Sequence, residues 1–229
     1  MAPKLFQKSI LLATLLFATA PAFACITCDR QIREGIFNSA FGQNVVVMIL
    51  PFAVLGGIVA LLARVSATWH ASARSMAKTP VPLLSAALIL GIGVGGFIDG
   101  IVLHQILQWH EMISAKLPPT TYVAKSVNMF WDGIFHAVTL GVTLVGIIRL
   151  WKLLQRTEID KRGALLAGGL IGGWGLFNIV EGVFDHHLLK LHNVRERTPD
   201  IDAWNYSFLL FSVALLLAGF LLARTKRTL

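Results

Sequence analysis

Asp99-Gly-Ile-Val-Leu-His104-Gln-Ile-Leu-Gln-Trp-His110 is the stretch from which the rest of this sequence can be interpreted. A second stretch, Glu181-Gly-Val-Phe-Asp-His-His-Leu-Leu-Lys-Leu-His192, follows 82 residues later and again places His five and eleven residues after the acid. Both lie in segments that are otherwise apolar enough to enter a lipid bilayer. A charged side chain there costs about 2.5–3.5 kcal/mol on insertion scales and marks a functional site by default. We therefore expect these acids and imidazoles to form a functional cluster.

The composition predicts an all-α membrane protein. Of 229 residues, 55% are hydrophobic and 14% are charged, which is too apolar for an ordinary soluble domain. The net charge of +8 does not indicate a nucleic-acid partner, because the basic residues collect in alternate loops. The partner that the composition predicts is the lipid bilayer.

The N-terminus predicts export. Residues 1–24 combine two lysines, a short apolar run and the cleavage pattern Ala22-Phe-Ala24, so we expect a signal peptide; lipidation of Cys25 is the alternative. The following Cys25-Ile-Thr-Cys28 is a disulfide, a dithiol redox pair, half of a soft-metal or other cofactor site, or idle thiols. It is not a c-type haem attachment, because Asp29 stands where His is needed.

Five apolar segments predict five mature transmembrane helices, at about 44–63, 81–103, 127–150, 164–189 and 204–223. The basic loops at 64–80 and 151–163 and the basic C-terminus place the N-terminus outside and the C-terminus in the cytoplasm, in a bacterial inner membrane. The chain then divides into a signal peptide (1–24), a CxxC segment with the first span (25–79) and a four-helix membrane domain (80–229).

The two long stretches belong to a wider pattern. The same offset pairs Gly91 and Gly93 with Gly173 and Gly175. Because both copies cross in the same direction, the sequence predicts two parallel helical-hairpin repeats about an axis along the membrane normal. The alternative is coincidence between glycine-rich helices. In either case the glycines favour close helix contact.

The topology puts the intramembrane ionisable groups in the outer half of the bilayer, but an ideal helix does not aim them at one point. His104 and His186 are turned about 140° from Asp99 and Glu181. His110 lies about 16 Å beyond Asp99 on an unbroken helix, too far to bind the same ion. A single periplasmic-facing site therefore needs a kink or ligands from a neighbouring helix.

Carboxylates and imidazoles from facing helices are a ligand set for zinc, copper or iron, which the sequence does not distinguish, and haem is a further possibility. The acids could instead orient the imidazoles, and a metal-free proton relay or structural pairing stays open. Neither Glu-x-x-His nor His-Glu-x-x-His occurs. The main candidates are Asp99, His104, Asp132, His136, Glu181, Asp185 and His186, and the secondary ones are His110, Asn178, His187 and His192.

The stretches at 95–110, 130–136 and 177–195 resemble an uncharacterised bacterial membrane family, domain of unknown function 2243, over about residues 80–223. The resemblance implies a four-helix membrane domain and leaves the activity open. The family tends to carry His where Glu111 and Asn193 stand, and this departure argues against the peripheral histidines as essential ligands.

The leading hypothesis is metal or cofactor handling at the outer membrane face, for example in respiratory oxidase assembly, with a respiratory-complex or periplasmic metal-handling partner. The alternatives are a metal-dependent membrane hydrolase, in which an acid activates metal-bound water, and a haem- or quinone-linked electron carrier. Whether the protein is an enzyme is left open.

Overall fold

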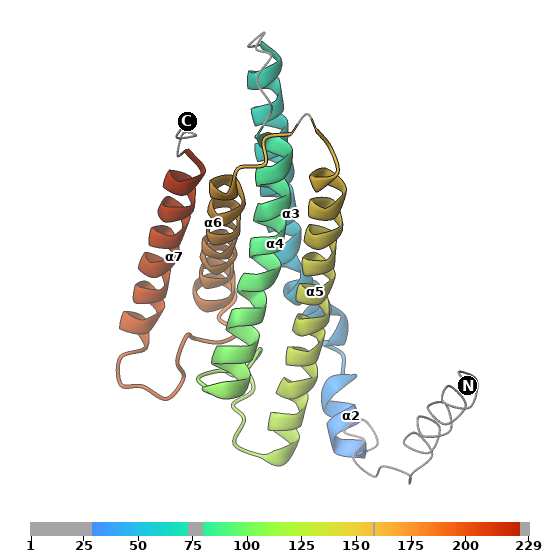
Figure 1. Cartoon of the computed structure of the whole chain (residues 1–229). Coiled ribbons are helices and arrows are strands. Elements are labelled where there is room, and N and C mark those ends of the chain that lie inside the picture. Colours follow the sequence, from blue (N-terminus) through green and yellow to red (C-terminus); the bar gives the residue numbers. More distant parts are fainter. Residues whose placement is uncertain (1–28, 73–79, 158, 225–229) are drawn as a thin grey trace, which may run out of the picture.

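The computed structural model describes residues 29–72, 80–157 and 159–224, with the side chains of 66–72 excepted. The predicted signal peptide and the Cys25–Cys28 pair lie outside the described residues. The described elements are all helical (Figure 1): α2 (Arg30–Ile36), α3 (Phe41–Ser72), α4 (Val81–Ile98), η2 (Asp99–Ile106), α5 (Tyr122–Leu154), α6 (Gly163–Glu181), η3 (Gly182–Leu188) and α7 (Ile201–Arg224).

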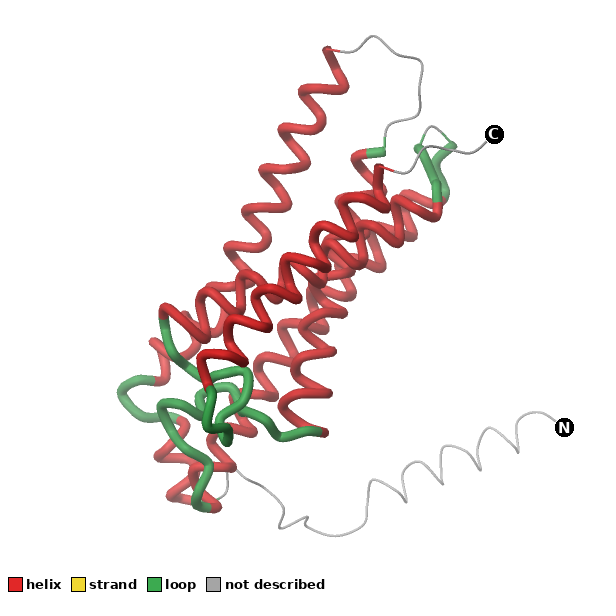
Figure 2. Tube along the Cα trace, turned by 90° about the vertical axis from the view of Figure 1, so that its left-hand side faces the viewer, coloured by secondary structure: helices red, strands yellow, loops and turns green. Residues whose placement is uncertain are grey.

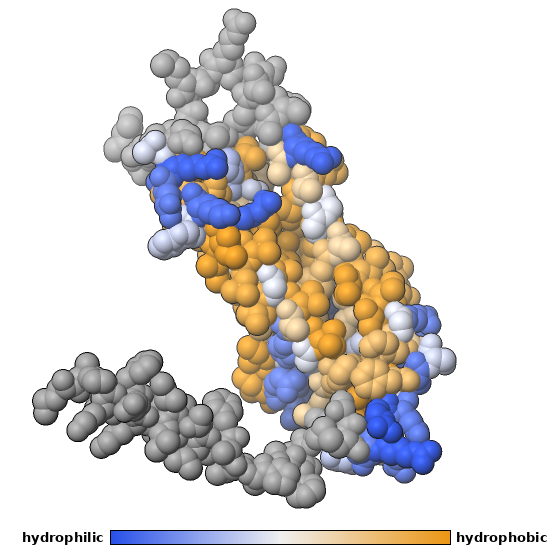
Figure 3. Space-filling view, turned by 90° about the vertical axis from the view of Figure 1, so that its right-hand side faces the viewer, coloured by the Kyte–Doolittle hydropathy of each residue, from blue (hydrophilic) through white to orange (hydrophobic). Residues whose placement is uncertain are grey.

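The prediction of five membrane-spanning helices is confirmed. Within the part of the chain that the structure describes, five segments are long and apolar enough to cross a bilayer: Phe41–Val65, Val81–Ile106, Tyr122–Leu154, Gly163–Leu188 and Ile201–Arg224. Figure 3 shows the matching surface, an apolar band between two hydrophilic ends. The short α2 was not anticipated. It begins where the Asp29 carboxylate accepts hydrogen bonds from the amides of Gln31 and Ile32, which is ordinary N-capping.

The parallel helices α4 and α6 form the centre of the bundle, because glycines let their backbones touch. A Cβ on Gly91 would overlap the carbonyl of Leu170, and a Cβ on Gly173 would overlap the carbonyl of Leu88. Helix α5 packs against α4 and α7 against α6, while α3 contacts both central helices (Figure 1). Consequently η2 and η3, which continue α4 and α6, lie at the same end of the bundle.

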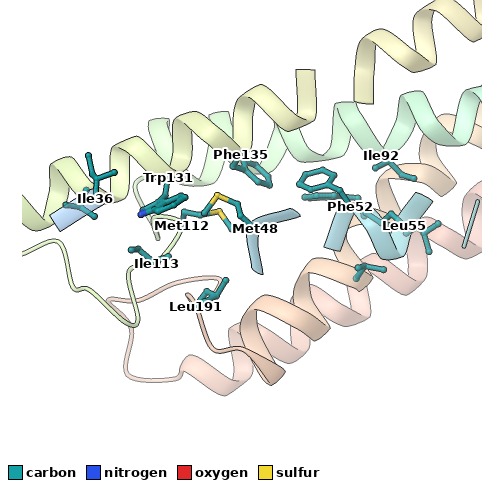
Figure 4. Packing of buried hydrophobic residues seen from close by; sticks show 14 of the residues in the cluster. Ile36, Met48, Phe52, Leu55, Ile92, Met112, Ile113, Trp131, Phe135 and Leu191 are labelled. Carbon is teal, nitrogen blue, oxygen red and sulfur yellow. The ribbon is translucent and has the colours of Figure 1, made fainter. Parts of the chain in front are cut away.

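The loops after η2 and η3 fold back onto that end, where Figure 2 shows them gathered. Met112 and Ile113 of the first loop and Leu191 of the second are buried in the main apolar cluster. Figure 4 shows Met112 beside Met48 of α3 and Trp131 of α5. Both loops are therefore anchored in the core.

Candidate metal centre

Two π-helical segments bring each acid and the histidine five residues later to the same side of the helix. Residues i and i+5 are joined by the backbone hydrogen bond of a π-helix, so they stack, whereas an α-helix turns them apart. His104 Nε2 lies 3.0 Å from Asp99 Oδ2 in η2. His186 Nε2 lies 3.5 Å from Glu181 Oε1 at the start of η3. A kink was one of the two routes to a single site that the sequence left open, and it takes the form of a local widening of the helix.

A reversal of the chain after η2 returns His110 to the acid. Leu107 donates its amide hydrogen to the Val102 carbonyl, and Gln108 adopts a left-handed conformation with φ 50°. His110 Nε2 then lies 3.8 Å from Asp99 Oδ1. The separation of about 16 Å that an unbroken helix would impose does not arise, because the helix ends two residues before Gln108.

The loop after η3 makes the same turn. Leu189 donates to the Phe184 carbonyl, and Lys190 has φ 51°. His192 Nε2 lies 3.3 Å from Glu181 Oε1. Each of these features occurs 82 residues after its counterpart in the first loop.

The result is one buried cluster of four imidazoles and two carboxylates. Its side chains form three overlapping groups, in each of which the possible ligand atoms lie within 4.8 Å of one another. The His110 and His192 rings stack with centroids 4.5 Å apart, and the His104 ring stands edge-on to His110 at 4.4 Å. The six members, each at most 3% exposed, are Asp99, His104, His110, Glu181, His186 and His192.

Three of the four imidazoles have their tautomer fixed. In each, Nδ1 bonds an oxygen and Nε2 faces the cluster; Nε2 has no hydrogen-bond partner in His104 and His110, and lies 3.3 Å from Glu181 Oε1 in His192. The pairs are His104 with the Asp132 carboxylate (2.9 Å), His110 with the Val194 carbonyl (2.9 Å) and His192 with the Met112 carbonyl (3.0 Å).

The two backbone contacts also run between the two loops. His110 and Met112 lie 82 residues before His192 and Val194. Each histidine therefore bonds the backbone carbonyl of the residue two positions after the other histidine. This crossed pair ties the two loops together across the cluster. It keeps the stacked rings in register with both acids.

Several buried polar atoms at the centre of the cluster have no hydrogen-bond partner. They are both oxygens of Asp99, Oε2 of Glu181, Nε2 of His104 and His110, and both ring nitrogens of His186. Burying such atoms unpaired costs several kcal/mol in total. Asp99 Oδ2 and His104 Nε2 approach to 3.0 Å without forming a hydrogen bond. Donor atoms that converge without pairing are what a ligand set around an ion requires.

The two histidines on the loops lie in opposite electrostatic surroundings. Burial, followed by the neighbouring His104 and His192 imidazoles, holds the pKa of His110 well below its ordinary value. Burial also opposes protonation of His192, but the hydrogen bond and charge of Glu181 outweigh it and raise the pKa of that ring. His110 is therefore a neutral donor, while His192 pairs with a carboxylate.

Asp132 lies outside the three groups and holds His104 in place. Its Oδ1 accepts from His104 Nδ1 and from the amide of Met112, both at 2.9 Å, and its Oδ2 accepts from Gln105 at 3.2 Å. Such carboxylate–histidine pairs orient ligands in metal sites. In the other half, Asn205 Oδ1 accepts from the amide of Val194 at 3.0 Å in the equivalent way.

Four other sequence candidates are not brought into the groups. The His136 ring bonds the carbonyl of Asp132 and lies against Gly100, while His187 bonds the carbonyl of Gly182 and packs on Tyr206. Asp185 and Asn178 are buried nearby. Conversely, His110 and His192, secondary in the sequence analysis, lie at the centre. The sequence did contain a signal for them, the histidine that follows each acid by eleven residues. An unbroken helix would have placed that histidine too far from the acid to share an ion.

The fold and the site together define a class of protein: a helical membrane bundle with a buried histidine–carboxylate cluster at one end. The chain belongs to the family described as predicted membrane protein, domain of unknown function 2243 (DUF2243), whose model matches residues 86–226, more than half of the chain. No curated protein and no solved structure matches it.

Proposed function

We propose that this protein holds a resident transition-metal centre in the cluster defined by Asp99, His104, His110, Glu181, His186 and His192. The observation that carries the proposal is a set of converging donor atoms without hydrogen-bond partners, on Asp99, Glu181 and His186 and on two rings whose Nδ1 is already bonded, His104 and His110. A metal ion would satisfy these atoms together and offset the cost of burying the carboxylates.

The donor set suits zinc, iron or copper, and six donors suffice for one octahedral ion or two ions of lower coordination. A bound metal would supply Lewis acidity or, for iron and copper, one-electron chemistry. The chain's own contribution is a dry, fixed geometry in which Asp99 and Glu181 balance the positive charge.

We place the centre at the outer face of a bacterial inner membrane. Supporting this placement, the bundle end away from the site carries a cationic excess, in Arg64, Arg149, Lys152, Arg156, Lys161, Arg162 and Arg224 against Asp160. At the site end, acids such as Glu111, Glu196 and Asp200 offset the cations. Basic residues stay on the cytoplasmic side. We further propose that the two halves are a true internal repeat, on the strength of the crossed His110 and His192 contacts.

Metal handling is the second candidate, and a polar pocket favours it. This pocket, of about 420 Å³, is lined by His110 together with Glu111, Ser114 and Lys125 on the loop side of the cluster. It would give an ion from the aqueous side access to one ligand. A handling site exchanges its metal within minutes of mixing with a chelator, whereas a resident centre retains it.

The test is the metal content of the full-length protein, purified in detergent without chelators. We expect stoichiometric metal in the wild type. His110→Ala and Glu181→Ala should each lose most or all of this metal content. The matched control is His136→Ala, which removes a histidine of the same region that lies outside the groups and should leave the metal content unchanged. Equal metal content in all four proteins, or none in the wild type, would contradict the proposal.

A further inference from the structure

An aromatic cavity lies beside the histidine–carboxylate cluster and shares only Asp99 with the proposed ligand set. It has a volume of about 270 Å³, and α4, η2, α6 and α7 contribute its walls together with both loops. The aromatic residues that line it are Trp109, Trp174, Trp204, Phe208 and Phe211. Flat aromatic walls favour a planar apolar ligand by stacking and edge contacts.

One end of the cavity is polar. Asp99 and Asn178 both line it, and they are 3% and 2% exposed. Asn178 Oδ1 and both oxygens of Asp99 are buried without hydrogen-bond partners. Asn178 Oδ1 accepts hydrogen bonds and lies outside the proposed ligand set, so the cavity ligand that satisfies it carries a donor such as a hydroxyl. Since Asp99 also lies 3.0 Å from His104, that donor would stand next to the metal ligands.

Another part of the cavity wall lies at the depth of the membrane. Phe211 is 47% exposed at the cavity wall and packs edge-on against Trp174 at 5.7 Å. It lies ten residues after Ile201, where α7 begins, and therefore about 15 Å into the apolar span. The exposed face of this wall residue therefore lies at hydrocarbon depth.

A separate aromatic contact lies on the loop side of the cavity. Trp109 and Trp204 meet at 5.0 Å, and the Arg195 guanidinium covers both rings at 5.4 and 5.2 Å. A cation over two aromatic rings stabilises this contact. The ligand would therefore come from the bilayer.

We infer that the cavity binds a membrane-dissolved molecule with a hydroxylated aromatic ring, of the hydroquinone class. The ring lies between the tryptophan and phenylalanine side chains, a hydroxyl donates to Asn178 Oδ1 beside Asp99, and an apolar tail leaves past Phe211. The inference rests on the proposed metal centre, because it names the class of molecule brought to that centre.

The first measurement is binding of two probes to the full-length protein in lipid nanodiscs, followed anaerobically by tryptophan fluorescence. The probes are a decyl-substituted dimethoxy-methylhydroquinone and its dimethyl ether, which lacks the hydroxyl hydrogens. We expect saturable binding of the hydroquinone and about tenfold weaker binding of the ether, the effect of one lost hydrogen bond. Equal affinities, or a signal that never saturates, would overturn the inference.

Variants locate the binding. Ser207 is exposed and lines the cavity, so Ser207→Phe fills it without disturbing buried packing and should weaken hydroquinone binding at least tenfold. Val213→Phe is the matched control, at a 44% exposed position of the same helix outside the cavity, and should bind like the wild type. Asn178→Leu should weaken the hydroquinone about tenfold and leave the ether unchanged. Equal hydroquinone binding by Ser207→Phe and the wild type would refute the cavity as the binding place.

Metal content is measured on every sample, so the two proposals fail separately. Wild-type protein that contains metal but shows no saturable hydroquinone binding would overturn this inference alone. Protein that binds the hydroquinone but contains no metal would overturn the proposed function and leave the cavity as a binding site.

Discussion

The substitution Asp132→Asn tests whether an acid outside the ligand groups controls the metal centre through His104. It removes one negative charge and keeps the shape of the side chain. The asparagine oxygen can still accept from the Met112 amide and from His104 Nδ1, which now bond Asp132 Oδ1 at 2.9 Å each. Folding should survive, because Asn205 already accepts the Val194 amide in the equivalent position at 3.0 Å.

The expected loss follows from the strength of one contact. A hydrogen bond to a charged group contributes about 1.5–3 kcal/mol, against about 0.5–1.5 kcal/mol for a neutral pair. The difference of roughly 1–1.5 kcal/mol corresponds to about tenfold in affinity, at the lower end of the 10–100-fold losses typical of such orienting residues. The variant should therefore bind metal about tenfold more weakly than the wild type.

The assay is competition with a chromophoric chelator of known affinity, on detergent-purified protein reloaded with metal. A thermal melt on the same samples reports folding. Asp160→Asn serves as control, because it removes a carboxylate that pairs with Arg162 at the opposite end of the bundle. Metal affinity of Asp132→Asn within twofold of the wild type, with an unchanged melt, would refute the role assigned to Asp132.

Three further predictions concern packing, backbone and acidity. Gly173→Val should destabilise the bundle by about 1–3 kcal/mol through overpacking against the Leu88 carbonyl, whereas Gly141→Val, which meets nothing within 4 Å, should not change the thermal midpoint. Lys190→Gly should keep its metal and raise the thermal midpoint slightly, because glycine accepts φ 51° without strain. Lys190→Val should lower both the metal content and the thermal midpoint. Equal thermal midpoints for the two variants would contradict a role for this turn. Acidification should release the metal, because imidazole and carboxylate ligands bind only in their deprotonated forms; binding should in turn release protons, measurable as buffer-dependent heat in calorimetry. Metal affinity that is flat between about pH 5 and 8 would contradict imidazole ligands.

Much of the architecture follows from the sequence. The five apolar segments define the spans because each unsatisfied backbone group in hydrocarbon is costly and a helix satisfies all of them internally. The glycines at Gly91 and Gly173 mark the contact between the central helices, since only a residue without Cβ lets the backbones approach so closely. Acids and histidines in these segments indicate a site, because burying charged side chains in hydrocarbon is also costly.

The membership of the cluster was decided by the tertiary structure. Sequence spacing assumes an α-helix, in which a residue five positions on points away, and the π-helical turns at Asp99 and Gly182 remove that assumption. The left-handed residues Gln108 and Lys190 then reverse the chain, and core packing of Met112 and neighbouring loop residues holds the reversal. A local pattern does not encode such a reversal, because it depends on contacts with other helices.

What the sequence determined by itself is therefore the number of helices, the close pairing of two of them and the types of ligand atom available. Which imidazoles meet which carboxylates, and which acid only orients a ring, was decided by the fold. The physical reason is that hydropathy and backbone size act on each residue separately. The direction of a side chain depends on how the whole bundle closes around it.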